Sequence, residues 1–244
     1  MVKGSELAGR TALVTGAAGA IGSAVARALS SAGARVIAFD RDLDANEALA
    51  AEIEGTAVTV DLADAAALSA AAAQVGPVDI LVNNAGVLSN NKIASTDLDE
   101  WRRVHAINVD AALIMAQAAL PRMRANRWGR IVNLASYAAK SGGLTAGTAY
   151  SVSKAALIGL TFSIARETAG EGVTANAIAP AYVMSPMISE QLSAEQRAAQ
   201  LAAIPVGRFC EPQEVAHAVL FLASPLAGFI TGEVIDMNGG LHFD

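Results

Sequence analysis

Short aliphatic and β-branched runs alternate along the whole chain with alanine-rich stretches of helical character. The runs end in Gly, Asn or Asp, and they read TALVTG, RVIAFD, AVTVD, DILVNNAG, GRIVNLAS, VTANAIAP and EVIDMNGG. Helices are predicted between them at 20–32, 43–54, 65–75 and 97–124, and in the stretch that carries Tyr150 and Lys154. Continuously apolar strands that alternate with helices predict a parallel sheet covered on both faces.

This alternation predicts one α/β domain over residues 1–244, a doubly wound Rossmann-type sheet of seven parallel strands with helices on both faces. The length of 244 residues is ordinary for one such domain, and no linker, low-complexity tract or longer repeat divides the chain. In such sheets, ligands bind beyond the carboxyl ends of the strands, where the strand order reverses. The residues that end the strands are therefore the first candidates for a functional site.

Composition and charge exclude several classes of function. The net charge is −6 and no run of Lys or Arg occurs, so the basic surface that nucleic acid or an anionic membrane requires is missing. One cysteine, Cys210, excludes an intrachain disulfide, and with three scattered histidines it gives no metal-ligand spacing, so no metal is expected. Cys210 is better explained as a small buried hydrophobe than as a reactive thiol.

Apolar content bears on location and assembly. Apolar residues make up 53% of the chain and charged residues 16%, which exceeds what one core of this size needs. Abundant alanine is one explanation, and helix faces buried in a homo-oligomer are the favoured one. The N-terminal MVKGSELAGR lacks the apolar stretch of a signal peptide, and Pro225 and Gly228 interrupt the apolar segment 215–232, so a cytoplasmic protein is expected.

The segment TGAAGAIG, residues 15–22, follows the first predicted strand and leads into a helix. Glycines there let the backbone approach a pyrophosphate, whose charge the N–H groups of the helix start attract. Asp40 ends the second strand, where a carboxylate can hydrogen-bond the ribose diol of an adenine dinucleotide. The same carboxylate would repel the additional phosphate of NADP, so NAD is predicted over NADP, although the adjacent Arg41 could reach such a phosphate.

Tyr150 and Lys154 stand four residues apart in TAYSVSKAAL and share one face of the predicted helix. By itself this spacing fits ordinary scaffolding, because a buried tyrosine beside a snorkelling lysine is common. The alternative is a catalytic pair. The remaining motifs decide between the two.

Those motifs form an ordered series: TGAAGAIG, NNAG at 83–86, Asn108, Ser136, and Tyr150 with Lys154. The series resembles the short-chain dehydrogenase/reductase family in its compact single-domain form. NAIAPAYVMSPM at 176–187 and ITGEVIDMNGG at 230–240 extend the resemblance over essentially the whole chain. It implies an NAD(P)-dependent oxidoreductase and a homotetramer, or else a homodimer. The catalytic residues that it implies are Asn108, Ser136, Tyr150 and Lys154.

The resemblance also implies the cofactor contacts, with Asp40 on the ribose and Asp61 near the adenine. The implied set is Gly16, Ala18, Ala20, Ile21, Gly22, Asp40, Asp61, Leu62, Asn83, Ala85, Gly86, Tyr150, Lys154, Pro180, Val183 and Ser185. Four details depart from the family pattern. Ala20 and Ala181 stand where Gly is usual, Ser185 replaces the common Thr and keeps its hydroxyl, and the interval between Ser136 and Tyr150 is one residue longer. They bear on cofactor affinity and remove no catalytic group.

In the expected reaction, Tyr150 takes the hydroxyl proton of a secondary alcohol while the nicotinamide takes the hydride. A free phenol has a pKa of about 10, and the nearby ammonium of Lys154 and the positive charge of the oxidised nicotinamide are both expected to lower it. Ser136 is expected to hold the substrate oxygen. Asn108 is expected to fix a water that passes the proton onward from Lys154.

The substrate is constrained less than the reaction. Residues 184–203 are predicted to form a lid that offers Met184, Met187, Ile188 and Leu192, and the plausible neighbours of the lid are Leu88, Tyr137, Leu144 and Tyr182. This lining favours an uncharged, medium-sized secondary alcohol or ketone. Alternatively, the same side chains pack against the body of the protein or a second subunit.

Three other functions stay open. A 3-oxoacyl-(acyl-carrier-protein) reductase needs basic docking residues, yet Glu167 and Glu171 stand where a cation would help, and Arg127 and Arg130 offer positive charge elsewhere. A sugar or polyol dehydrogenase of the same family is the second. A catalytically silent NAD-sensing module is the third, although such a module needs no full catalytic set.

Overall fold

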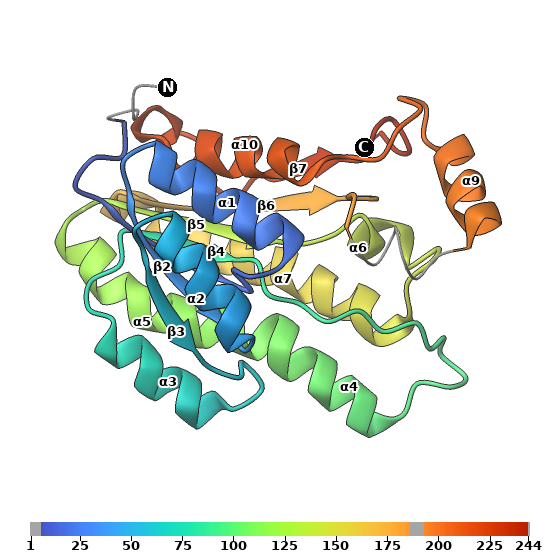
Figure 1. Cartoon of the computed structure of the whole chain (residues 1–244), viewed down its shortest axis with the longest axis horizontal. Helices are drawn as coiled ribbons and strands as arrows, with labels where there is room; N and C mark the ends of the chain where they lie inside the picture. Colours follow the sequence, from blue (N-terminus) through green and yellow to red (C-terminus); the bar gives the residue numbers. More distant parts are fainter. Residues whose placement is uncertain (1–5, 186–192, 244) are drawn as a thin grey trace.

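The computed structural model describes residues 6–185 and 193–243 and contains one seven-stranded parallel sheet (Figure 1). Its strand order is β3-β2-β1-β4-β5-β6-β7. The strands are β1 Thr11–Thr15, β2 Arg35–Asp40, β3 Thr56–Thr59, β4 Ile80–Asn83, β5 Gly129–Leu134, β6 Val173–Pro180 and β7 Val234–Met237. All seven predicted strands are confirmed.

Helices cover both faces of this sheet, as predicted. They are α1 Ala20–Ser31, α2 Leu43–Glu52, α3 Ala65–Gln74, α4 Leu98–His105, α5 Ala111–Ala125, α6 Ala138–Ser141, α7 Thr148–Thr168, α9 Ala194–Ala203 and α10 Pro212–Ala223. Aspartate N-caps mark the first turn of three of these helices. Asp42, Asp64 and Asp97 each accept hydrogen bonds from the first backbone N–H groups of α2, α3 and α4.

Each face of the sheet buries its own hydrophobic core. Val14 and Val82 point to the side where α1 and α10 pack together, whereas Leu13 and Leu81 point to the side of α3, α5 and α7. Figure 1 shows these helices above and below the strands. Almost every residue of β1, β4, β5 and β6 is buried, so these strands are covered on both faces, as is typical of parallel sheets.

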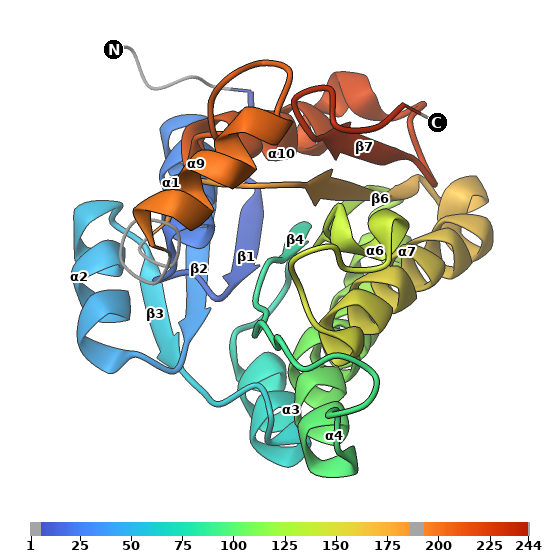
Figure 2. The same cartoon turned by 90° about the vertical axis from the view of Figure 1, so that its right-hand side faces the viewer.

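The strand order reverses between β1 and β4, which lie side by side in the sheet. β1 pairs with β2 on one edge and with β4 on the other, so Leu13 stands opposite both Ile37 and Leu81. The crossovers after β1 and β4 leave in opposite directions and open a crevice at the carboxyl ends of these strands. The functional site is therefore expected at this edge, which faces the viewer in Figure 2.

The predicted helix 97–124 is not one regular helix. A π-helical turn, η1 Ala106–Asp110, separates α4 from α5, and Asn108 lies in it with its side chain buried. The combined stretch Leu98–Ala125 is the one candidate, among the described residues, that is long and apolar enough to cross a membrane. Here it packs against α3, α7 and the sheet. The apolar segment 215–232 is a buried helix followed by a turn, as predicted.

Candidate active site

Two glycines shape the loop between β1 and α1. Gly16 has a φ of 63°, and a Cβ on it would stand 2.8 Å from the Cα of Ala85. A Cβ on Gly22 would stand 2.1 Å from the carbonyl oxygen of Gly16. Both positions therefore exclude side chains, and the loop has the close backbone packing that lets a pyrophosphate approach the N-terminus of α1. This loop fits a dinucleotide cofactor, with Ala20 and Ile21 in the first turn of the helix.

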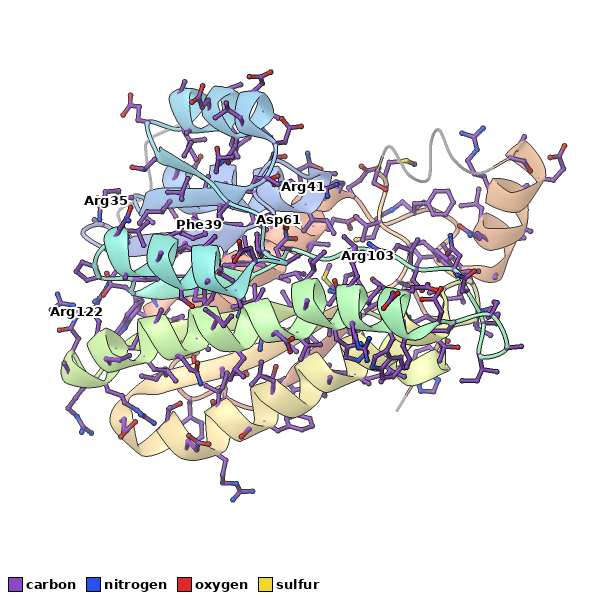
Figure 3. The ribbon with its side chains drawn as sticks, turned by 90° about the horizontal axis from the view of Figure 1, so that it is seen from below. Arg35, Phe39, Arg41, Asp61, Arg103 and Arg122 are labelled. Atoms are coloured by element: carbon purple, nitrogen blue, oxygen red, sulfur yellow. The ribbon has the colours of Figure 1, made fainter. Side chains whose placement is uncertain are left out.

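Asp40 ties the end of β2 to the same loop. Its Oδ2 accepts a hydrogen bond from the backbone N–H of Ala18 at 2.9 Å, and its Oδ1 accepts one from the N–H of Asp42 at 3.0 Å. The carboxylate is thereby fixed at the strand end. Asp61 lies exposed beyond β3, near Arg41 in Figure 3, whereas the side chain of Leu62 is buried in the core.

In the NNAG segment after β4, some residues are buried in the interior and others border the crevice. The side chain of Asn83 is buried and donates to Asn133 at 2.9 Å, so it does not reach the crevice. The next amide, of Asn84, donates to the carbonyls of Thr15 and Gly16 at 2.9 and 3.0 Å. Ala85 donates its N–H to the Thr15 hydroxyl at 3.1 Å. Asn84 was not among the predicted residues, although it stands in the same motif.

Three of the four predicted catalytic side chains meet at the carboxyl end of β5. Ser136 follows this strand, and its hydroxyl is hydrogen-bonded to that of Tyr150, which lies in the first turn of α7. Lys154 lies one turn further, with Nζ 5.8 Å from the Tyr150 ring centroid. Its Nζ donates to the Leu134 carbonyl at 2.6 Å. The helix thus presents both side chains to one point, as their spacing predicts.

Burial dominates the electrostatics of this pair. It lowers the pKa of Lys154 to about 8, because the ammonium is desolvated. It also raises the pKa of Tyr150, an effect that the hydrogen bond from Ser136 opposes. The expected lowering of the Tyr150 pKa by the Lys154 ammonium and the oxidised nicotinamide together stays a prediction for the complex with the cofactor; in the protein by itself, burial raises this pKa.

Asn108 supports the pair from the π-helical turn. Its Oδ1 accepts from the N–H of Val87 at 2.8 Å, and its Nδ2 donates to the Ser153 hydroxyl at 2.9 Å. Ser153 in turn donates to the Tyr150 carbonyl at 2.7 Å. A Cβ on Gly86 would stand 3.1 Å from Lys154 Nζ and 3.4 Å from Asn108 Oδ1, so both atoms border this glycine. A water held between Asn108 and Lys154 stays a prediction.

A cavity of about 500 Å³ runs from the glycine loop to α9 and collects most of these residues. The predicted residues that line it are Ile21, Gly86, Leu88, Ser136, Tyr137, Leu144, Tyr150, Lys154, Pro180, Tyr182, Val183 and Ser185. Polar lining residues that the sequence did not single out are Asn84, Asn90, Ser141, Thr145 and Gln200. Among the described lining residues, only Lys154 carries a charge.

The predicted lid is placed in part. Met184 packs with Tyr182 against Ile204 and Phe209, so it contacts the body of the protein. Met187, Ile188 and Leu192 lie outside the described residues. Among the described residues of the predicted lid, Ser185 and Gln200 line the cavity, and Met184 does not.

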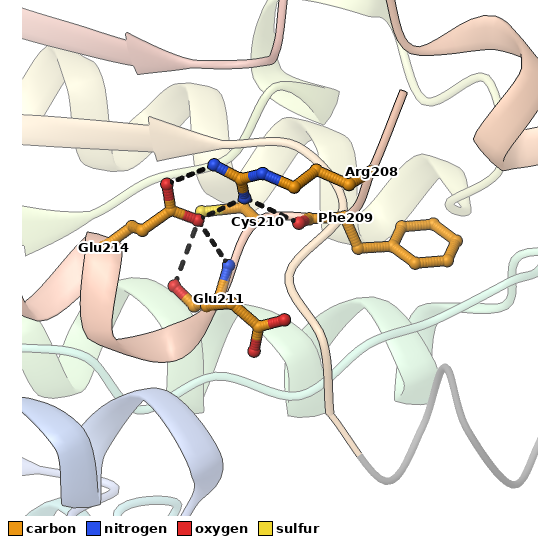
Figure 4. A network of polar contacts seen from close by, with 5 residues as sticks. All are labelled: Arg208, Phe209, Cys210, Glu211 and Glu214. Atoms are coloured by element: carbon orange, nitrogen blue, oxygen red, sulfur yellow. Dashed lines mark hydrogen bonds and ion pairs between the residues drawn. The ribbon is translucent and has the colours of Figure 1, made fainter. Parts of the chain in front are cut away.

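A polar network holds the segment that forms the cavity wall near Val183. Val183 forms an isolated β-bridge with Cys210, and Arg208 pairs with both carboxylate oxygens of Glu214, at 2.6 and 2.7 Å (Figure 4). Glu214 also accepts from the N–H of Glu211 at the start of α10. Cys210 is half-buried, and burial raises the pKa of its thiol to about 11, so the thiolate is scarce at neutral pH.

A family model described as Enoyl-(Acyl carrier protein) reductase matches residues 16–242. The chain belongs to the short-chain dehydrogenase/reductase family. It is 40% identical to the 3-oxoacyl-(acyl-carrier-protein) reductase FabG of Vibrio cholerae, over 97% of this chain and 99% of the relative. It is 37% identical to the FabG of Escherichia coli, over 96% and 98%.

Solved structures of this family have the same fold. One, from Beutenbergia cavernae, is provisionally assigned as an NAD(P)-dependent gluconate 5-dehydrogenase and holds NADP at low occupancy; it has a TM-score of 0.90 and 41% identity over 97% of this chain and 98% of that chain. The 3-oxoacyl-(acyl-carrier-protein) reductase of Brucella melitensis has a TM-score of 0.94 and 32% identity, over 100% and 95%. The protein is therefore an oxidoreductase that interconverts alcohol and carbonyl groups with a nicotinamide cofactor.

Proposed function

We propose that this short-chain dehydrogenase/reductase interconverts an uncharged secondary alcohol and its ketone, with NAD preferred over NADP, in one domain that spans residues 1–244. The observation that carries the proposal is the single cavity that joins the glycine loop to Ser136, Tyr150 and Lys154, with Lys154 its only charged lining residue among those described. An anionic substrate would find no second cation there. An uncharged substrate needs none.

The chain's own residues account for the proton transfer. The backbone around Gly16 and Gly22 and the carboxylate of Asp40 would hold the dinucleotide, which when bound supplies or accepts a hydride. The Ser136 hydroxyl holds the substrate oxygen against the Tyr150 hydroxyl, and the two are already hydrogen-bonded. Tyr150 exchanges the proton as general acid and base, a contribution typically of about 10²–10⁴-fold in rate. Lys154 holds positive charge beside it.

The cofactor preference rests on Asp40. Two backbone N–H groups fix its carboxylate at the end of β2, so a negative charge stands where an adenosine ribose is bound in this fold. Arg41 is exposed and adjacent, and the Beutenbergia structure holds NADP, so the test must measure both cofactors. We expect kcat/KM to favour NAD. A preference for NADP of about tenfold, or about 1.4 kcal/mol, would contradict the proposal.

A carrier-protein reductase is the second candidate, because the FabG relatives carry that activity in their names. An acidic carrier protein requires free cations near the site. Arg124 pairs with Glu171 at 2.6 Å, and Arg127 donates to the Gly170 carbonyl at 3.0 Å. Arg130 is 3% exposed and donates to the Ser224 carbonyl. These internal contacts favour a small substrate over a carrier-bound one.

Tyr150→Phe tests the proposal. The purified protein is incubated with NAD and a panel of secondary alcohols, and with NADH and a 3-oxoacyl thioester, while nicotinamide absorbance is followed. We expect turnover of an alcohol by the wild type, loss of turnover in the variant, and unchanged NAD binding by calorimetry. Retained turnover in Tyr150→Phe would contradict its role. NAD binding without turnover of any compound would favour the silent sensing module.

A cytoplasmic location and a homotetramer complete the proposal. A dissociable dinucleotide is supplied inside the cell, which supports the location. Exposed apolar side chains on α5, α7 and α10 support assembly, with a homodimer as the alternative.

A further inference from the structure

A buried serine on α7 joins this helix to the π-helical turn. Ser153 and Asn108 are 0% and 1% exposed, and the Asn108 Nδ2 donates to the Ser153 hydroxyl at 2.9 Å. That hydroxyl donates its own proton to the Tyr150 carbonyl at 2.7 Å. In a regular α-helix the same carbonyl accepts the backbone N–H four residues on, which here belongs to Lys154. The Ser153 hydroxyl is therefore bonded to the backbone at the point that links Tyr150 to Lys154.

The same Asn108 side chain is also bonded to the segment that follows β4. Its Oδ1 accepts from the N–H of Val87 at 2.8 Å, and its Nδ2 donates to the Val87 carbonyl at 3.2 Å. The preceding residue, Gly86, lines the cavity, and a Cβ on it would stand 3.1 Å from the Nζ of Lys154. A continuous chain of hydrogen bonds thus runs from the cavity wall after β4, through Asn108 and Ser153, to the backbone of α7.

Donors and acceptors in this chain match in one arrangement. The hydroxyl of Ser153 has a single proton, which the Tyr150 carbonyl accepts, so toward Asn108 the hydroxyl oxygen accepts a hydrogen bond. The N–H of Val87 requires an acceptor, and the amide oxygen of Asn108 supplies it. Among the described residues, Ser153 is the only group of α7 to which the Asn108 side chain is hydrogen-bonded. Without this hydroxyl, one amide hydrogen of Asn108 loses its partner, and the side-chain link between the π-helical turn and α7 is lost.

We propose that Ser153 is a positioning residue: through Asn108 it holds the segment after β4, which borders the cofactor crevice, in place relative to Tyr150 and Lys154. This inference rests on the proposed catalytic roles of Tyr150 and Lys154 and is independent of the substrate class. Transfer of a hydride and a proton requires the reacting groups in near-attack geometry, and a misplacement of about 1 Å can lower the rate about 10²-fold. Ser153 is not among the described lining residues of the cavity, so it acts without contact to the substrate.

Ser153→Ala tests the proposal, measured with a compound of the panel that the wild type turns over. We expect kcat to fall about tenfold or more, while KM, and the Kd and stoichiometry of NADH binding by calorimetry, stay within about twofold of the wild type. Ser153→Thr keeps the hydroxyl and should keep most of kcat. Thr168→Val is the matched control, because the Thr168 hydroxyl is also buried on α7 and donates to the Ile164 carbonyl at 2.9 Å, at the other end of the helix. It should lower the melting temperature and leave kcat unchanged.

Three outcomes would overturn the assignment. An unchanged kcat in Ser153→Ala would show that the catalytic geometry does not depend on this hydroxyl. Equal losses of kcat in Ser153→Ala and Thr168→Val would reduce the effect to a general destabilisation of α7. Weaker NADH binding in Ser153→Ala with kcat retained would assign the serine to the cofactor site.

Two further measurements keep the result decisive. Should Ser153→Ala fail to fold, Ser153→Cys takes its place, because a thiol fills the same site and is only a weak donor; wild-type kcat in that variant overturns the assignment as well. Tyr150→Phe separates this inference from the proposed function. An inactive Tyr150→Phe beside a fully active Ser153→Ala overturns only the role of Ser153, whereas retained turnover in Tyr150→Phe, or no turnover of any compound by the wild type, contradicts the proposed function itself.

Discussion

At the residue scale, the decisive feature is a buried lysine that has no carboxylate partner among the described residues. Lys154 is 3% exposed, and the acceptor of its Nζ is the neutral carbonyl of Leu134. Desolvation therefore acts on the ammonium without a compensating ion pair and lowers its pKa to about 8. Tyr150, beside it, has a raised pKa. The first proton that this pair loses thus leaves near neutral pH, and the pair then has a basic site for the proton of the substrate.

This arrangement predicts the pH dependence of both directions of the reaction. Because the pair accepts a proton in alcohol oxidation only after it has lost one, kcat/KM for oxidation should rise with pH and level off above about pH 8. For ketone reduction it should fall above the same pH, since the proton to be donated is gone. Steady-state rates between pH 6 and pH 10 measure both profiles.

Lys154→Met supplies the control for this pH profile. With the lysine removed, only the raised pKa of Tyr150 remains, so the inflection should move to higher pH and oxidation at neutral pH should drop. An inflection that stays in place in Lys154→Met would assign the titration to a group outside the pair.

The site residues also show how far single positions can be predicted. Ser136, Tyr150 and Lys154 are identified by their motif order, and the structure brings them together. Asn83 and Asn84 are adjacent in the same motif, and their roles depend on which side of β4 each faces, which the motif does not state. Gln200 has no motif at all. Its position follows from where α9 crosses the crevice, a tertiary contact that no local pattern encodes.

At the element scale, one lysine holds a loop that forms part of the cavity wall. Lys92 Nζ donates to the carbonyls of Gly143 and Ala146, each at 2.6 Å, and to that of Leu144 at 3.4 Å. The N–H of Gly147 donates to the Ser89 carbonyl at 2.6 Å, which joins the same two segments. Leu144 and Ala146 line the cavity, whereas Lys92 is not among its lining residues. The position of this part of the cavity wall therefore depends on Lys92 from outside the cavity.

Lys92→Met should therefore weaken substrate binding more than catalysis. The variant keeps the length of the side chain and leaves three carbonyls without their shared donor, and hydrogen bonds to charged groups contribute about 1.5–3 kcal/mol. We expect KM for the substrate to rise about tenfold, with kcat and the Kd of NAD little changed. Hydrogen exchange at residues 143–147 should quicken. Lys92→Arg should restore part of the loss, and an unchanged KM in Lys92→Met would show that the loop holds its position without the ammonium.

The elements themselves follow from sequence except where a side chain changes the backbone pattern. The helix predicted at 97–124 is correct in extent, yet it contains the π-helical turn at Ala106–Asp110. There the amide of Asn108 is directed inward to Val87 and Ser153. The helical period of apolar residues does not indicate this turn or the two hydrogen bonds of its Asn108, whose partners are 21 and 45 positions away in the sequence.

At the scale of the whole molecule, the fold is the most predictable property. Every strand is apolar and short, every connection is helical, and a right-handed crossover then leaves few possible arrangements. The sequence also predicted a site at the carboxyl ends of the strands, and residues that follow β4 and β5 line a cavity there. Interaction surfaces are less predictable than the fold, because no sequence period or motif identifies the partner of an exposed apolar side chain. Assembly is therefore inferred from the surface of the folded chain.

Two separate apolar surfaces stand on opposite sides of the sheet. One comprises Leu113 on α5 with Val152 and Phe162 on α7, which are 42%, 41% and 48% exposed. The other comprises Phe221 on α10 with Phe229 beyond it, which are 50% and 102% exposed. A tetramer with dihedral symmetry uses two different self-complementary interfaces, whereas a dimer uses one. The presence of two such surfaces favours the homotetramer.

Charge substitutions on each surface test this assembly. Phe162→Glu should break the first interface and Phe229→Glu the second, because a buried unpaired carboxylate opposes association. Light scattering coupled to size exclusion gives the mass as a multiple of the 24.8 kDa chain. We expect a tetramer for the wild type and for the control Gln74→Glu on α3, a dimer for each phenylalanine variant, and a monomer for the pair combined. A wild-type monomer, or a tetramer that survives both substitutions, would show that these two surfaces do not hold the assembly.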